Sequence, residues 1–161
     1  MIKALVLAAL LVAAPIFAQA HEVKAGDLTL KHPHMRASMG MSPTTAGYLV
    51  IENGGRSGDR LVSAACTCAK MVMIHQTEIK NAMASMKALD GMDIPAGGRA
   101  ELAPGGTHLM IMGLKAPIKA GTMVNMTLTF AKAGRVTVPF MVMDKAGRDM
   151  GGMHGMDHSQ H

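Results

Sequence analysis

Short apolar segments alternate with glycine-rich turns between Asp27 and Met143, and this pattern limits the fold more than any other feature. Turn sequences such as "ENGGRSGD", "APGG" and "KAGR" separate the apolar segments. No apolar segment shows sustained helical periodicity with capping residues. Many short strands at this spacing predict an all-β fold, a Greek-key sandwich or barrel. The expected strands are Asp27–His32, Ala46–Glu52, Arg60–Cys66, Met71–Ile79, Arg99–Leu102, His108–Leu114, Thr122–Ala131 and Arg135–Met143.

The two ends of the chain differ from this middle part. Lys3, the apolar run "ALVLAALLVAA" and the small-residue sequence "AQA" predict a cleaved signal peptide at residues 1–20, hence export to the periplasm without stable membrane insertion. Residues 144–161 contain no Val, Ile, Leu or aromatic residue, which predicts a flexible tail. Residues 21–143 would then form one β-domain.

Composition restricts the function in two ways. Hydrophobic residues make up 49% of the 161-residue chain but aromatic residues only 2%, so some of the 18 methionines must fill core volume. The basic residues behind the net charge of +5 are scattered, without a stripe or an aromatic platform. Nucleic acid is therefore not an expected partner. We also expect the protein to be a monomer.

Histidine and methionine share one face in each of two expected strands. Alternation places side chains two residues apart on the same side of a strand. These faces carry Met71, Met73 and His75 in the first strand, and His108, Met110 and Met112 in the second. The sequence "NAMASMKALDGM", interpreted as a connection, adds Met86 between the two strands.

Four of these residues follow the spacing H-x10-M-x21-H-x-M: His75, Met86, His108 and Met110. A chain of this composition would contain about 0.005 such patterns by chance. The pattern, with the flanks "AGDLTLKHP", "GYLVIENGG" and "VTVPFMV", resembles the periplasmic PCu(A)C copper chaperones. The resemblance implies a cupredoxin-like β-sandwich in which these four residues bind Cu(I). It also implies copper delivery towards the Cu(A) centre of cytochrome c oxidase, alongside Sco-type proteins.

The residue types support the same chemistry independently. Thioether sulfur is a soft ligand suited to Cu(I), and imidazole accepts either copper oxidation state. A set without carboxylates disfavours Mg²⁺ and Ca²⁺. Four protein ligands leave no open position for an activated water, so the set suits holding and transferring a metal better than catalysis.

Other sulfur and imidazole groups receive different interpretations. Met71, Met73 and Met112 are predicted to pack in the protein or to shield the site. Cys66 and Cys68 are interpreted as accessory residues, with a disulfide, Cu(I) binding and intermolecular pairing left open. At the expected mature N-terminus, His21 would offer an amine and an imidazole, and His32, His34 and Met35 lie nearby.

The tail is a second candidate copper site, suited to Cu(II) through histidine or to Cu(I) through methionine; a solubilising tail is the alternative. Its candidate ligands are Met150, Met153, His154, Met156, His158 and His161. The functional prediction is an exported copper chaperone that is not an enzyme. The alternatives are a periplasmic copper buffer for tolerance and, last, a copper enzyme using His21.

Overall fold

The computed structural model describes residues 22–38, 40 and 42–144. The predicted signal peptide, His21 and the tail ligands between Met150 and His161 lie outside these residues. In the described part no helix is long and apolar enough to cross a membrane.

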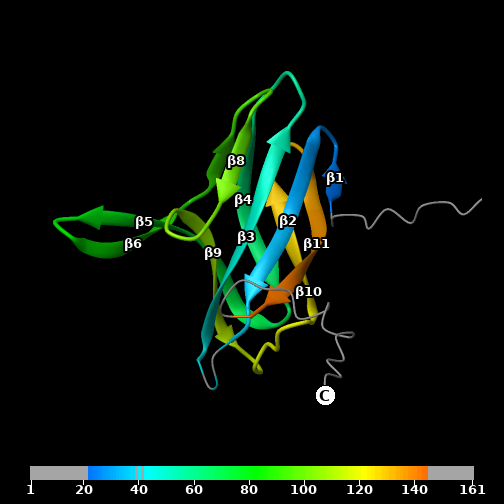
Figure 1. Ribbon diagram of the computed structural model, residues 1–161. Helices are drawn as coiled ribbons and strands as arrows, with labels where there is room; N and C mark the ends of the chain where they lie inside the picture. Colours follow the sequence, from blue (N-terminus) through cyan, green and yellow to red (C-terminus); the bar gives the residue numbers. More distant parts are fainter. Residues whose placement is uncertain (1–21, 39, 41, 145–161) are drawn as a thin grey trace, which may run out of the picture.

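Every regular element of the described residues is a β-strand, which confirms the predicted all-β class (Figure 1). The strands are β1 Val23–Ala25, β2 Leu28–Arg36, β3 Thr44–Asn53, β4 Asp59–Cys66, β5 Ala69–Lys80, β6 Met83–Leu89, β7 Met92–Ile94, β8 Arg99–Leu102, β9 Thr107–Leu114, β10 Met123–Phe130 and β11 Gly134–Met143.

Seven strands close into a barrel in the order β2-β11-β10-β4-β5-β9-β3, because β3 also pairs with β2. Short strands extend this barrel: β1 pairs with β2, β8 with β3 and β7 with β4. Neighbouring strands are antiparallel except β11 and β2, which run parallel. Closure leaves no free edge among the seven strands, and each has one face towards the interior.

The barrel interior is mainly aliphatic, and buried methionine adds to the few aromatic side chains. Met35 and Met126 are fully buried beside Phe140, as the low aromatic content predicted for part of the methionine. Gly47 lies among these side chains, and a Cβ added there would stand 3.4 Å from atoms of both Ile111 and Met126. Such close packing leaves little volume inside the barrel for a ligand.

Three short strands were not predicted: β1, β6 and β7. Of these, β6 matters most, because it turns the supposed connection around Met86 into a hairpin with β5 that projects from the barrel (Figure 1). Asn81 and Ala82 at its tip both have positive φ, 52° and 61°, as a tight type I′ hairpin turn requires. The strand was missed because its alanine, serine and lysine residues have low β-propensity.

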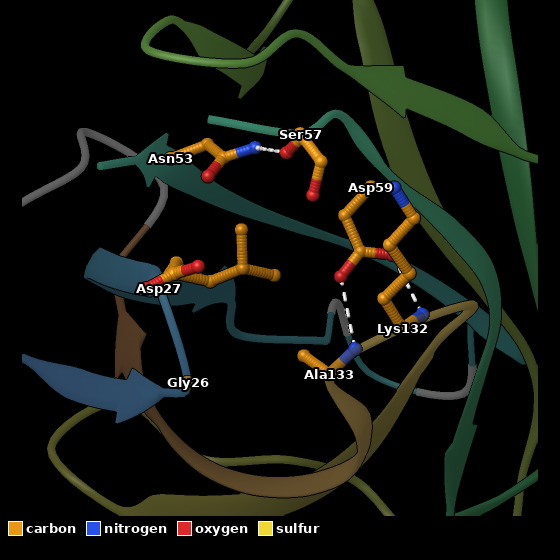
Figure 2. Close-up of a pocket in the computed structure, with 8 residues that line it drawn as sticks. Gly26, Asp27, Asn53, Ser57, Asp59, Lys132 and Ala133 are labelled. Atoms are coloured by element: carbon orange, nitrogen blue, oxygen red, sulfur yellow. Dashed lines mark hydrogen bonds between the residues drawn. The ribbon is translucent and has the colours of Figure 1, made fainter. Parts of the chain in front are cut away.

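The side chain of Asp59 connects the start of β4 to the β10–β11 turn by hydrogen bonds (Figure 2). Its carboxylate accepts backbone N–H bonds from Arg60 at 2.7 Å, Lys132 at 2.9 Å and Ala133 at 3.0 Å. Burial by itself raises the pKa of Asp59, but the three hydrogen bonds outweigh it, so the pKa lies below its usual value. The pocket beside Asp59 is lined by neither histidine nor methionine and is no candidate copper site.

We predict that Asp59→Asn lowers the free energy of unfolding by about 1 kcal/mol at pH 7, because the amide oxygen is a weaker acceptor than the carboxylate. Since the folded-state pKa is depressed, this stabilisation is present above the unfolded-state pKa and disappears as the pH falls through the folded-state value. Urea unfolding at pH 7 and at pH 3 measures the difference. An equal difference between the two proteins at both pH values would contradict the assignment.

Candidate metal centre

Three neighbouring strands, β6, β5 and β9, place the predicted ligands on one face. His75 of β5 stands directly across from His108 of β9. The next pair on that face joins Met73 to Met110. On the other side of β5, Ala88 of β6 is the partner of His75, and Met86 lies two residues from Ala88 on the same face. The structure therefore makes His75 and His108 direct neighbours on one face, with Met86 diagonal to His75 on β6 and Met110 two residues from His108 on β9.

The two imidazole rings are close enough to share one metal ion. Their centroids lie 6.2 Å apart, with the planes inclined at 72°. A metal bound to a ring nitrogen at about 2.0–2.1 Å lies about 3.2 Å from the ring centroid. Two such distances span at most about 6.4 Å, when the ion lies on the line between the rings, so the observed separation is within reach of a single ion.

Hydrogen bonding leaves one nitrogen of each ring available to a metal. Nδ1 of His108 lies 3.1 Å from the carbonyl oxygen of Gly106, to which its N–H donates; Nε2 is then an unprotonated ligand. Nδ1 of His75 is buried and has no hydrogen-bond partner. A buried polar atom without a partner is costly, and a bound metal ion would satisfy it.

The two thioether-bearing residues flank the histidine pair and differ in exposure. Met86 is 60% exposed on β6, whereas Met110 is half-buried and His108 is only 4% exposed. Because β6 pairs with β5 alone, Met86 belongs to the hairpin and the other three residues to the barrel. The site is thus closed on the barrel side and open on the hairpin side.

Hard oxygen ligands do not accompany these residues. Among the described residues, no group of three His, Cys, Asp or Glu side chains could hold a metal ion. Glu78, the carboxylate of the hairpin, alternates to the opposite face from His75 and forms an ion pair with Lys80 at 2.9 Å, which lowers the pKa of Glu78. A metal at this position would depend on two imidazoles and neutral thioethers, a donor set that favours Cu(I) over Ca²⁺, Mg²⁺ or a structural zinc ion.

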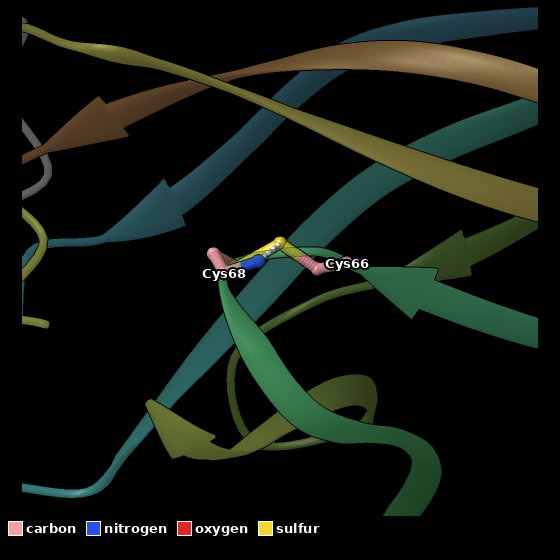
Figure 3. The surroundings of a disulfide bond; sticks show 2 residues. All are labelled: Cys66 and Cys68. Carbon is pink, nitrogen blue, oxygen red and sulfur yellow. Dashed lines mark hydrogen bonds between the residues drawn. A yellow bond between two sulfur atoms is a disulfide. The ribbon is translucent and has the colours of Figure 1, made fainter. Parts of the chain in front are cut away.

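Cys66 and Cys68 form a disulfide at the turn between β4 and β5 (Figure 3). Of the alternatives left open from the sequence, the structure therefore has the intramolecular bond. Both residues also pack against the core, seven or more positions from His75 along the chain. In this oxidised form neither sulfur is a thiolate ligand for copper.

The remaining candidates near the N-terminus lie apart from this centre. His34 on β2 donates a hydrogen bond from its Nδ1–H to the His32 carbonyl oxygen at 2.8 Å, and its ring centroid lies 5.3 Å from that of Tyr48. Met35 is fully buried in the core. His34 and Met35 thus face opposite sides of β2, and the structure does not bring them together as a ligand pair.

The interpretation of one methionine was wrong. Met71, Met73 and Met112 were predicted to pack in the protein or to shield the site. Packing is wrong for the exposed Met71, whereas shielding by the half-buried Met73 and Met112 stays a prediction. Met71 is 51% exposed, and none of the three is among the apolar side chains that pack against the core. They lie on the outer face that also carries the histidine pair.

Sequence reasoning also missed the carbonyl of Gly106, which orients His108. The signal for it was the glycine pair immediately preceding "THLM", since a glycine turn can direct a carbonyl back towards the following strand.

Comparison with known proteins agrees with this architecture. The family model described as "Putative lipoprotein LpqE-like" matches residues 28–142. A curated relative, the putative lipoprotein Lxx21020 of Leifsonia xyli subsp. xyli (strain CTCB07), is 38% identical over 107 residues, 66% of this chain. That alignment spans 64% of the relative's own length.

Solved structures share the barrel. The copper-bound PCuAC domain from PmoF2 is 27% identical, with a TM-score of 0.68 over 77% of this chain and 98% of that domain. The solution structure of CuI-DR1885 from Deinococcus radiodurans is 30% identical, with a TM-score of 0.61 over 81% of this chain and 85% of that one. Because the family model spans most of the barrel and these neighbours share its fold, the chain belongs to the LpqE-like family and is a cupredoxin-like protein of the PCu(A)C type.

Proposed function

We propose that this protein is an exported copper chaperone that binds Cu(I) through His75, Met86, His108 and Met110. The observation that carries the proposal is the histidine pair: two rings 6.2 Å apart, one with a buried nitrogen that lacks a partner. Thioether side chains stand at neighbouring positions on both sides of this pair. The similar structures of the PmoF2 domain and DR1885, which are described as copper-bound and Cu(I)-bound, support copper as the cargo.

The chemistry of the proposed ligands favours transfer of Cu(I) to an acceptor protein. Thioethers are neutral and need no proton on release, so an acceptor's thiolates can replace them stepwise while copper stays Cu(I). Met86 is the most exposed of the four residues, and we propose that exchange begins there. The proposed acceptor is a Sco-type copper protein or the Cu(A) subunit of cytochrome c oxidase. Four protein ligands leave no open position for catalysis, which supports a carrier.

The chain ends complete the proposal. Residues 1–20 would direct export to the periplasm and be removed, and residues 21–143 would form the copper-binding domain. The tail would bind further Cu(I) or Cu(II) through its methionines and histidines and raise the local copper concentration beside the barrel.

We predict that replacing a ligand with alanine weakens Cu(I) binding by about 100-fold or more. Loss of an outer partner of a ligand already costs about 10–100-fold, and loss of the ligand itself costs at least as much. His75→Ala, Met86→Ala, His108→Ala and Met110→Ala are measured by anaerobic competition with a chromophoric Cu(I) chelator. His34→Ala is the matched control, because His34 lies on β2 away from the histidine pair. Unchanged affinity in all four variants would overturn the site.

Removing the tail after Asp144 should leave this Cu(I) site intact, because its ligands all lie on β5, β6 and β9. X-ray absorption of the copper-loaded protein should show both nitrogen and sulfur scattering before and after truncation. Loss of the mixed scattering on truncation would place the copper in the tail instead.

A copper buffer remains the second candidate, favoured by the Met/His composition of residues 144–161. Deletion of the gene distinguishes the two functions. For a chaperone we expect cytochrome c oxidase activity to fall at low copper and to recover when copper is added. Copper sensitivity with normal oxidase activity would instead identify the buffer.

A further inference from the structure

Four methionines form a continuous row on the outer face of β5 and β9. Met71 stands across from Met112, and Met73 across from Met110. We call Met71, Met73, Met110 and Met112 the methionine strip. Side chains directly opposite on antiparallel strands have Cβ atoms about 4.5–5.5 Å apart, and diagonal neighbours about 7–8 Å. The strip continues the row that ends in the His75–His108 pair.

Core packing does not explain the strip. Met71 is 51% exposed, the other three members are half-buried, and none belongs to the apolar side chains packed against the core. Exposed strand positions favour β-branched and aromatic residues, which fit a pleated surface better than methionine does. Two consecutive cross-strand pairs made only of methionine therefore call for another role.

The neighbouring strands leave the thioethers accessible. On one side, β3 places Thr44 beside Met112 and Ala46 beside Met110. On the other side, the register of β4 places the exposed residues Ser63 and Ala65 next to β5. All four flanking side chains are small, so they do not cover the sulfur atoms, and none carries a charge that would repel a cation.

We propose that Met71, Met73 and Met112 bind a second Cu(I) ion on the barrel surface, separate from the tail and beside the histidine site. Three neutral thioethers form a soft donor set that selects Cu(I) over hard or divalent cations. Methionine has three rotatable bonds, so sulfurs from direct and diagonal neighbours can converge on one ion. Without imidazole this site binds Cu(I) more weakly than the histidine site.

Position gives the second site its role. Met73 is the cross-strand partner of Met110, a proposed ligand of the histidine site, so the two sites share a boundary. Copper entering at the exposed Met71 reaches the histidine pair by exchange of one thioether for the next, with no change in oxidation state. The choice of copper rests on the proposed function, but the site itself is tested without the histidines.

The first test uses the full chain with ¹³C-labelled methionine methyl groups in a His75→Ala/His108→Ala background, titrated with silver nitrate. Ag(I) is a soft monovalent cation that does not change oxidation state. We expect the methyl signals of Met71, Met73 and Met112, assigned from single Met→Leu variants, to shift together. Absence of these shifts would overturn the second site. The titrated protein itself keeps all four methionines of the strip, and the Met→Leu variants serve only to assign the signals.

The second test counts Cu(I) by anaerobic chelator competition. Met71→Leu/Met73→Leu/Met112→Leu should bind one Cu(I) fewer than the parent, because leucine keeps the volume but offers no sulfur. Met83→Leu/Met123→Leu is the matched control, since both residues are exposed and lie outside the strip. Equal stoichiometry in the triple variant and the parent would overturn the proposal. All variants carry the same tail, so any Cu(I) bound by the tail adds equally to each count.

The two tests also separate this proposal from the proposed function. If His75→Ala/His108→Ala binds as much Cu(I) as the parent with the same affinity, the histidine site is wrong. The methyl shifts in that same background still report whether the methionine strip binds metal.

Discussion

The register between β5 and β9 is the constraint on which the rest of the site depends. It sets His75 opposite His108 and, through Ile74 opposite Leu109, sends the intervening side chains into the core. Because side chains alternate with a period of two, a slip by one residue would turn the histidines inward and the core residues outward. Core packing and ligand placement therefore fix the same register, and the barrel cannot form without also assembling the ligand row.

The length of β5 explains how one strand serves both the barrel and the hairpin. Pairing with β9 runs from Ala69 to Gln76, while pairing with β6 runs from Ile74 to Lys80. The two ladders overlap around His75, which therefore has a strand on each side. Beyond Thr77, whose N–H donates to the Gly106 carbonyl at 3.2 Å, only β6 pairs with β5. A two-stranded hairpin outside the barrel gains little from core packing. His75 thus lies where the rigid part of the sheet meets its least supported part.

The sequence predicted the eight main strands because their alternation and glycine turns are local signals. It also predicted which faces of β5 and β9 carry His75 and His108, since that needs only a period of two. It could not show that these strands are neighbours, because pairing between distant segments depends on the whole topology. Met86 illustrates the limit: its strand lacks β-forming residues and exists because β5 offers an unpaired edge. The exposure of Met71 was missed for a related reason: alternation gives the face that it shares with His75, but only the assembled barrel shows that this face points outward.

Exposure is distributed among the four proposed ligand residues in a way that would suit transfer more than storage. His108 is 4% exposed and oriented by a backbone carbonyl, so it is held in place before any metal arrives. Met86 is 60% exposed on the hairpin, where local opening costs less than in the barrel. A metal bound by these residues would be held by the rigid barrel on one side and by the more easily opened hairpin on the other. In the proposed transfer, an acceptor that displaces Met86 would need to disturb only the hairpin, and the closed barrel behind His108 would keep its packing.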